Sequence, residues 1–239
     1  MIAFLDAEFN SMGEDKSIIE VALVICDESN KKLPTVEVYH SFVKPKRNKG
    51  KIYPRIRELT GITQKQINSG KTFDAVMREL EDRINKYKIS AIYTWDVADR
   101  RIFEWNCIGD KIPSKSKVIG KFKNYQTTFM NQIKINKEHI ALSNAAYICG
   151  CKERPAHNAK DDALTLRDIY HQAKNGQFNK KKRNDYLSYV NDRHFYNMLS
   201  IAVDSLNKKS VNPKFMITGA MEGKDFPGFK EYEETLCNS

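Results

Sequence analysis

Short apolar runs separated by turn-forming residues fill the first part of the chain, a pattern that is typical of β-strands. The first run begins at Ile2, and residues 17–26 and 36–43 repeat its enrichment in β-branched and aromatic side chains. Three such runs in close succession predict an antiparallel meander at the start of the fold.

The spacing of the apolar residues changes after residue 71, from strand-like runs to the period of an amphipathic helix. Phe73, Val76, Leu80 and Ile84 mark one face of a predicted helix over residues 72–87. The later predicted segments are a strand at 89–95, a helix from Asp96 or Val97, helices at 124–133 and 142–149, and a last helix from Asp161 or Asp162 to about His171. Strands followed by strand-helix alternation predict an α/β fold, with a mixed sheet and helices on its faces.

The composition fits a soluble protein with one sizeable core and an appendage. The 239 residues have a hydrophobic content of 41% and a mean hydropathy of -0.60. No apolar run has the length of a membrane span, and Asp6 interrupts the hydrophobic stretch at the N-terminus. We therefore expect a cytoplasmic protein with no membrane partner. The five cysteines form no C-x-x-C pair, so reduced thiols are expected, and Cys149-Gly150-Cys151 is interpreted as the tight end of a helix.

The formal net charge of +10 at pH 7 favours an anionic partner, of which nucleic acid is the commonest. Part of this charge lies in one loop that also contains Pro and Gly; its basic residues are Lys44, Lys46, Arg47, Lys49, Lys51, Arg55 and Arg57. The loop could follow the phosphates of a bound strand, or it could be an ordinary solvated loop. Both interpretations stay open.

Two carboxylates, Asp6 and Glu8, interrupt the first predicted strand. Alternate side chains of a strand share a face, so both acids project from the same side. An edge strand with solvated acids would explain them, but their neighbours are apolar: Ile2, Phe4, Leu5 and Phe9. Two carboxylates in apolar surroundings repel each other unless positive charge lies between them, so the pair indicates a divalent cation.

Three further segments make this pattern more specific. One carries Asp99 after an apolar run and Trp95, one has His157 five positions before Asp162 in the pattern H-x-A-x-x-D-A, and residues 59–63 read Leu-Thr-Gly-Ile-Thr. Together with Asp6-Ala7-Glu8-Phe9, they resemble the motifs of the DEDDh family of 3'-5' exonucleases over residues 1–173. The amino-acid sequence around Trp95 is most similar to that of the branch of sporulation-inhibitor and histone-mRNA exonucleases. The resemblance implies a ribonuclease H-like fold.

The resemblance also implies a set of catalytic groups. Four carboxylates would hold two Mg2+ or Mn2+ ions and one histidine would act as general base; these are Asp6, Glu8, Asp99 and Asp162, with His157 as the base. Two such ions stabilise the charge that develops on the attacking and leaving oxygens of a phosphodiester. A neutral imidazole can accept the proton of the attacking water near physiological pH. The other histidines, His40, His139, His171 and His194, are expected to be surface or packing residues.

Two of the assigned acids have an acidic neighbour that could replace them. Asp96 and Asp99 both fit the middle segment, and either could cap the following helix. The family motif favours Asp99 as the ligand, which leaves Asp96 as the cap. Of Asp161 and Asp162, Asp162 has the family spacing from His157, so Asp161 is expected at the N-cap.

A substrate-contacting loop is the last implication of the resemblance. Leu59, Thr60, Gly61 and Ile62 would hold the terminal nucleotide, with a base stacked on Leu59 or Ile62, and Phe9 and Asn10 could line the same pocket. Asn10 departs from the threonine often found at its position. Without the resemblance, the same loop can be interpreted as a helix that ends at a glycine.

The motifs predict an exonuclease domain over residues 1–173 and a C-terminal extension of unknown role, mainly helical, over residues 174–239. The expected function is a metal-dependent 3'-5' exonuclease that acts on single-stranded nucleic-acid 3' ends and releases nucleoside 5'-monophosphates, with RNA favoured over DNA. The alternatives are a DNA exonuclease in proofreading or repair and a catalytically silent nucleic-acid-binding module that serves recruitment. The sequence gives no basis for an oligomeric state.

Overall fold

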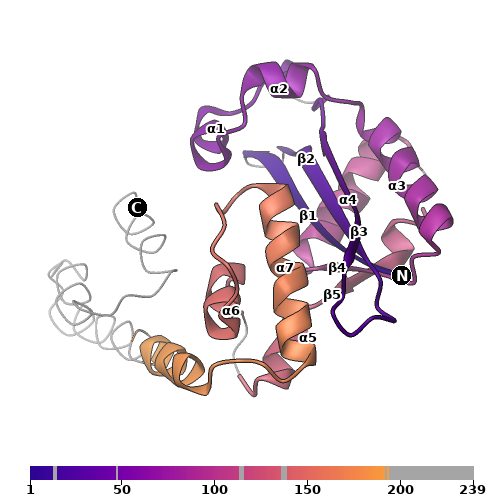
Figure 1. The fold of residues 1–239 in the computed structure, drawn as a ribbon. Helices are drawn as coiled ribbons and strands as arrows, with labels where there is room; N and C mark the ends of the chain where they lie inside the picture. The colour runs from indigo at the N-terminus through magenta and orange to yellow at the C-terminus, as the bar shows by residue number, and fades with distance from the viewer. Residues whose placement is uncertain (13–14, 47, 113–115, 136–138, 192, 194–239) are drawn as a thin grey trace, which may run out of the picture.

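A mixed five-stranded sheet, in the order β3-β2-β1-β4-β5, forms the centre of the fold (Figure 1). The computed structural model of the chain describes residues 1–193 except for 13–14, 47, 113–115, 136–138 and 192. The strands are β1 (Ile2–Met12), β2 (Asp15–Cys26), β3 (Thr35–Phe42), β4 (Ala91–Thr94) and β5 (Phe122–Asn124). The first three pair antiparallel in succession, which confirms the predicted meander, and β4 and β5 join in parallel.

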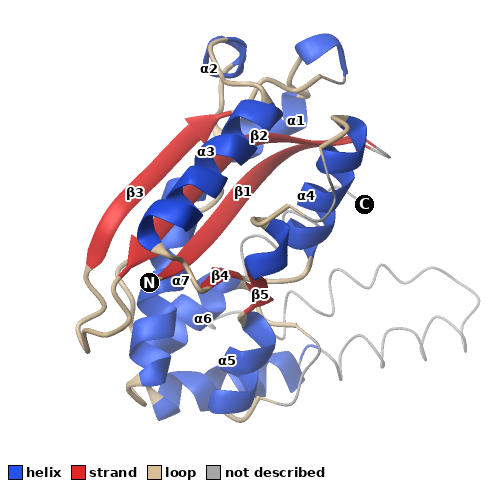
Figure 2. Cartoon of the chain, turned by 90° about the vertical axis from the view of Figure 1, so that its right-hand side faces the viewer, coloured by secondary structure: helices blue, strands red, loops and turns tan. Residues whose placement is uncertain are grey.

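Helices cover both faces of the sheet (Figures 1 and 2). They are η1 (Asn48–Gly50), α1 (Pro54–Thr60), α2 (Gln64–Asn68), α3 (Phe73–Tyr87), α4 (Ala98–Gly109), η2 (Ile119–Lys121), α5 (Gln126–Gln132), α6 (Leu142–Cys149) and α7 (Ala159–Lys174). α3 and α4 lie on one face, whereas α5, α6 and α7 lie on the other. The arrangement confirms the expected α/β class with a ribonuclease H-like mixed sheet.

The alternation of side chains along β1 decides which face each residue serves. Ala3 and Leu5 pack into the core under α3 and α4, whereas Ile2 and Phe4 pack into the core under α5, α6 and α7. Asp6 and Glu8 continue the even-numbered series, so they face α7. A β-bulge after Glu8 ends this regular register.

Several elements differ from the sequence-based expectations. β5 was not predicted, because a three-residue strand is too short to show a period; α5 consequently begins at Gln126 rather than near residue 124. α7 begins at Ala159, two residues before the earlier expected start, because Asn158 rather than Asp161 occupies the N-cap. The Asp161 assignment was therefore wrong, and Asp161 lies in the first turn of the helix.

The tight helix end at Cys149-Gly150-Cys151 is confirmed, since α6 stops at Cys149 and Gly150 has a left-handed φ of 64°. The four cysteines in the described part of the chain are free thiols. None of the helices within the described ranges is long and apolar enough to cross a membrane.

The first part of the C-terminal extension is helical, over residues 180–191, which agrees with the expectation. Tyr186 belongs to the same buried core as α5, α6 and α7, and Leu187 and Val190 pack against that core. The expectations for His194, Cys237 and the rest of the extension lie outside the described residues.

Candidate active site

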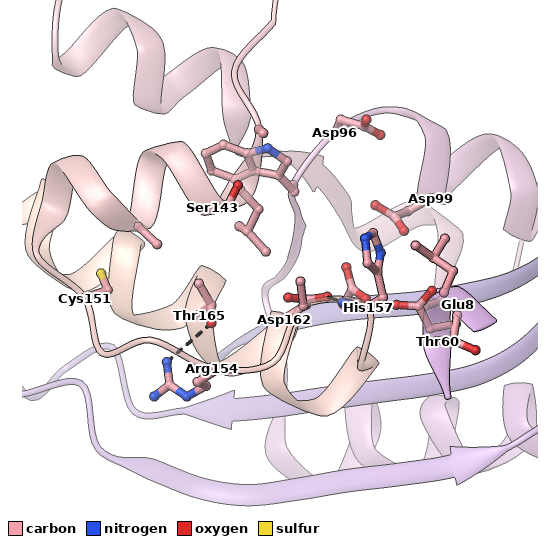
Figure 3. Close-up of a pocket in the computed structure, with 18 of the residues that line it drawn as sticks. Glu8, Thr60, Asp96, Asp99, Ser143, Cys151, Arg154, His157, Asp162 and Thr165 are labelled. Atoms are coloured by element: carbon pink, nitrogen blue, oxygen red, sulfur yellow. Dashed lines mark hydrogen bonds between the residues drawn. The ribbon is translucent and has the colours of Figure 1, made fainter. Parts of the chain in front are cut away.

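A pocket of about 750 Å³ opens beside the middle of β1 (Figure 3). Its walls come from β1, the end of α1, the start of α4, α6 and the loop that leads into α7. Elements from both faces and from distant parts of the sequence therefore converge on it. The five residues with implied catalytic roles, Asp6, Glu8, Asp99, His157 and Asp162, all line this pocket.

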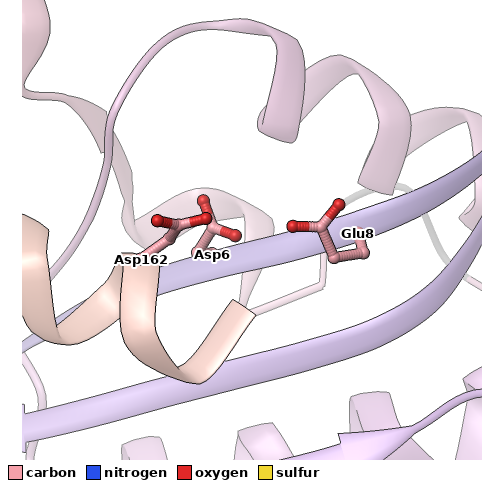
Figure 4. A group of neighbouring side chains, drawn as sticks. All are labelled: Asp6, Glu8 and Asp162. Carbon is pink, nitrogen blue, oxygen red and sulfur yellow. The ribbon is translucent and has the colours of Figure 1, made fainter. Parts of the chain in front are cut away.

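Three of these carboxylates form one cluster (Figure 4). Asp6 and Glu8 project from the same face of β1, and Asp162 reaches towards them from the first turn of α7. One carboxylate oxygen from each residue lies within 4.8 Å of the others. Such a group of oxygen donors suits a hard divalent cation such as Mg2+ or Mn2+.

Electrostatics support the suitability of this cluster for a cation. Burial, followed by repulsion from Asp99, Asp162 and Glu8, raises the pKa of Asp6 well above its ordinary range. Burial and the charge of Asp162 raise the pKa of Glu8 to about 7, and burial raises the pKa of Asp162 to about 6. The protein thus holds several carboxyls whose charged forms are disfavoured until positive charge arrives.

Asp99 lies at the edge of this cluster, in the first turn of α4. Its side chain is buried, and burial together with the charges of Asp96 and Glu8 raises its pKa well above the ordinary value. Asp96 also lines the pocket, but its Oδ1 accepts a 2.5 Å hydrogen bond from the amide of Ala98. The expectation that Asp96 is the N-cap was wrong, because the N-cap is Val97. Asp96 lies one residue earlier and still accepts the hydrogen bond from the first residue of α4.

His157 is held in an uncommon backbone conformation in the loop before α7. Its φ of 59° is left-handed, which is rare for a residue with a Cβ and is often found at functional sites. The amide of His157 donates a 3.0 Å hydrogen bond to Oδ2 of Asp162, which joins the two motif residues directly. In Figure 3 the imidazole lies between Asp99 and Glu8, and its positive form lowers the pKa of Glu8.

Two residues beside the cluster were missed or interpreted differently from the sequence. Glu20 is only 1% exposed, and its position opposite Glu8 on β2 brings a further carboxylate under the site. Its Oε2 accepts a hydrogen bond from the amide of Ala159 at 3.0 Å, and its Oε1 lies 2.6 Å from Nε2 of His40. His40, expected to be a surface or packing residue, packs on Phe42 but is also the partner of this buried acid.

A signal for Glu20 exists in the sequence. Glu20 interrupts an apolar run, Ile18-Ile19-Glu20-Val21-Ala22. The four apolar residues of this run are all buried. A buried charge needs a partner, so its presence in such a run indicates an ion pair or a hydrogen-bonded role.

The expected substrate residues divide into two groups. Phe9, Leu59 and Thr60 line the pocket, and Leu59 is 52% exposed. Gly61 ends α1 with a left-handed φ of 69°, as expected for a helix that ends at a glycine. Gly61 does not line the pocket.

The side chains of Asn10 and Ile62 lie elsewhere than expected. Ile62 is 3% exposed and packs with Ile19 and Ile67, so it offers no face on which a base could stack. Asn10 is fully buried; it donates to the carbonyl of Lys51 and accepts from the amide of Tyr53. Asn10 bonds the segment just before α1 and Ile62 packs just after it, so both residues support the helix that carries Leu59 rather than line the pocket.

A model of the RNase T family, described as exonuclease, matches residues 3–170 of the chain. The chain belongs to this exonuclease family. The exonuclease is 29% identical over 168 residues to the probable 3'-5' exonuclease KapD of Bacillus subtilis (strain 168), which covers 69% of this chain and 77% of KapD.

Solved structures share the fold of the exonuclease. A 3'-exonuclease solved in a study of 3'-end-specific recognition of the histone mRNA stem-loop has a TM-score of 0.65 and 18% identity, covering 74% of this chain and 83% of that one. The nuclease domain of 3'hExo, a DEDDh family member bound to rAMP, also has a TM-score of 0.65, with 20% identity and coverage of 75% and 96%. These neighbours confirm the expected ribonuclease H-like fold.

The chemistry available to the exonuclease follows from the site. A phosphodiester and its attacking water gain negative charge during hydrolysis, and the cluster of acids can bind the divalent cation that compensates this charge. The histidine beside the cluster can accept a proton within the same pocket. The pocket thus brings a group of possible metal ligands next to a side chain that can accept a proton.

Proposed function

We propose that this exonuclease degrades single-stranded nucleic acid from the 3' end, with RNA favoured as substrate, and releases nucleoside 5'-monophosphates. The observation that carries the proposal is the cluster of Asp6, Glu8 and Asp162, whose ligand oxygens lie within 4.8 Å of one another in a pocket that His157 also lines. Carboxyls with raised pKa values that cluster in a pocket are concentrated at functional sites, which supports the proposal.

In this proposal each residue has a distinct role. Asp6, Glu8 and Asp162 hold divalent cations, and Asp99 completes the set of ligands from α4. Two ions, Mg2+ or Mn2+, supply the positive charge that stabilises the attacking and leaving oxygens. The position of Asp6 among the acids is central. Its pKa is raised by the charges of four neighbouring carboxylates, those of Asp99, Asp162, Glu8 and Glu20.

His157 is the general base. The water oxygen forms a bond to the terminal phosphorus while the bond from phosphorus to the 3' oxygen of the preceding nucleotide breaks. The water proton passes to a ring nitrogen of His157, and the departing oxygen takes up a proton to become a free 3' hydroxyl. The products are a nucleoside 5'-monophosphate and a strand that is one nucleotide shorter.

The pocket wall formed by Phe9, Leu59 and Thr60 supports binding of a terminal nucleotide next to the acids. The exposed side chain of Leu59 can contact a base of any identity, which suits an enzyme that removes successive nucleotides. RNA is favoured because the two structural neighbours described above were studied with a histone mRNA stem-loop and with rAMP.

The test is a gel time course on matched single-stranded RNA and DNA oligomers labelled at the 5' end. The reactions contain Mg2+, Mn2+ or EDTA, and Asp6→Asn serves as the inactive control. We expect a ladder that shortens from the 3' end, faster on RNA, and absent with EDTA or in the variant. Faster cleavage of DNA would contradict the RNA assignment, and binding without digestion would support a recruitment module instead.

A further inference from the structure

The active-site pocket continues beyond the acids, along α6 and towards the C-terminal extension. Figure 3 shows Cys151, Arg154 and Thr165 on the side of the pocket away from Glu8 and Thr60. The residues that line this distal part include Leu142, Ala146, Tyr147, Lys152, Arg154 and Lys182. A pocket of about 750 Å³ has more room than a metal centre with one terminal phosphate requires.

The charge of the pocket changes sign along its length. The end at β1 is acidic, whereas Lys152, Arg154 and Lys182 contribute cations at the other end. Arg154 is already neutralised, since it lies 2.6 Å from Oδ2 of Asp168. The one acid among the distal lining residues, Glu153, is exposed to solvent.

Lys182 is placed by an aromatic contact. Its Nζ lies 4.1 Å from the centre of the ring of Tyr147, which is a cation-π distance. Within the described part of the chain, Lys182 forms no ion pair with a carboxylate, so its charge is available to an anion in the pocket. Both residues line the pocket, one from α6 and the other from the helical residues 180–191.

The segment that carries Lys182 is attached firmly to the nuclease fold. The guanidinium of Arg183 donates hydrogen bonds to the carbonyls of Ile133 and Lys134, just after α5. The amide of Asn179 donates to the carbonyl of Ile148 in α6. Anchors on both sides of Lys182 fix its position, although it lies beyond residue 170, where the family match ends.

We propose that Lys182, which is positioned by Tyr147, binds a backbone phosphate of the nucleic-acid strand on the 5' side of the scissile bond. The C-terminal extension thereby contributes directly to the substrate path. The proposal rests on the proposed function, because it assumes that a strand lies with its 3' end at the acids. Charge complementarity and the continuity of one pocket carry it. Tyr147 and Leu142 add an apolar surface for the sugar and base, so the contact does not depend on base identity.

The proposal predicts a defect that depends on substrate length. Lys182→Met removes the charge but keeps an apolar stem against Tyr147, so the fold is retained. Lys182→Arg keeps the charge. The matched control is Lys181→Met, because Lys181 is the adjacent exposed lysine and does not line the pocket.

The measurements compare a single-stranded 20-mer with the p-nitrophenyl ester of thymidine 5'-monophosphate, which has no upstream phosphate. In Lys182→Met we expect the KM for the 20-mer to rise about five-fold relative to that for the ester. The slope of log K against log salt concentration for 20-mer binding should decrease by an amount that corresponds to the loss of about one phosphate contact. Lys182→Arg should restore most of the affinity. Equal behaviour of the Lys182→Met and Lys181→Met variants on the 20-mer would overturn the proposal.

A binding experiment separates this proposal from the proposed function. Fluorescence anisotropy of a labelled 20-mer in EDTA measures affinity without turnover. Native protein that hydrolyses neither substrate would refute the exonuclease assignment, whereas weaker 20-mer binding in Lys182→Met would still support the phosphate contact. Unchanged binding in that variant would refute the phosphate contact, whatever the activity of the native protein.

Discussion

The amide of Ala159 donates a hydrogen bond to the carboxylate of Glu20, 3.0 Å away and 139 positions earlier in the chain. This bond attaches the first turn of α7 to the centre of β2. The first turn carries Asp162, and the loop before it carries His157, so the bond sets both relative to the acids of β1. On the other side, Nε2 of His40 lies 2.6 Å from Oε1 of Glu20.

Replacement of Glu20 should therefore lower kcat by more than the accompanying loss of global stability can explain. In Glu20→Ala we expect a fall in kcat of at least about ten-fold, because a shift of Asp162 and His157 by a fraction of an ångström already disturbs a catalytic geometry. Glu20→Gln retains an acceptor for Ala159 and should recover most of kcat.

Glu28 offers a matched control for this prediction. It holds the other end of α7 through Tyr170 and Lys174, far from the acids in sequence and register. Glu28→Ala should lower the melting temperature without lowering kcat to the same extent. Equal losses of kcat in Glu28→Ala and Glu20→Ala would mean that Glu20 acts through overall stability alone.

Metal binding should become more stabilising as the pH rises. The raised pKa values of Glu8, about 7, and Asp162, about 6, mean that the folded state holds protons more tightly than the unfolded state. For the metal-free protein, the stability from these groups is present below their unfolded pKa of about 4 and is lost as the pH rises through about 6 to 7.

Thermal unfolding with Mg2+ and with EDTA checks this prediction. The difference in Tm between the two conditions should be larger at about pH 8 than at about pH 5.5, because a cation binds the ionised carboxyls. A difference that does not change with pH would mean that the ion binds elsewhere. In Asp6→Asn the difference should be small, and the EDTA sample should be at least as stable as native protein, since burial already disfavours the charge of Asp6.

Loss of the imidazole should separate catalysis from metal binding. We expect His157→Ala to lower kcat by about 10² to 10⁴-fold, the usual contribution of a general base. The stabilisation by Mg2+ should remain. His171→Ala is a suitable control, because His171 does not line the pocket and Nε2 of His171 forms a solvent-exposed contact of 3.0 Å with the carbonyl of Lys31. Loss of Mg2+ stabilisation in His157→Ala would make His157 a metal ligand.

The two acids at the start of α4 should respond differently to amidation. Asp99→Asn is expected to reduce kcat far more than Asp96→Asn, since Asn at position 96 can still accept the hydrogen bond from Ala98. Parallel kinetics of the two variants on one RNA oligomer test the ranking. The reverse order would assign the ligand role to Asp96.

The sequence predicted those parts of the fold in which a pattern repeats. The meander and the bounds of α6 followed from runs of apolar residues, and α3 followed from its period. β5 has three residues and offers no period at all. The start of α7 was misplaced because Asn158 was not considered as a cap, and its side chain caps the helix by accepting a hydrogen bond from the amide of Asp161.

The site was predictable where motif spacing carries information. Asp6, Glu8, Asp99, His157 and Asp162 meet in one pocket as the motifs implied. The role of Asn10 could not be foreseen, because the β-bulge after Glu8 changes which face the following residues of β1 serve, and that of Ile62 could not, because a loop sequence does not reveal which side chains turn towards the core. Glu20 was missed because its partners come from β3 and from α7, which only the folded chain brings together.

Tyr186 is buried in the core that α5, α6 and α7 form on the sheet, so the end of the family match is not the end of the folded unit. The family match ends at residue 170, but the apolar surface beneath the following helix is part of the same core. A protein shortened to residues 1–173 would keep every motif of the family and still expose that surface to water. Expression of the motif-bearing region alone should accordingly yield an aggregation-prone product, and a shortened protein for crystallisation should extend at least through residue 191.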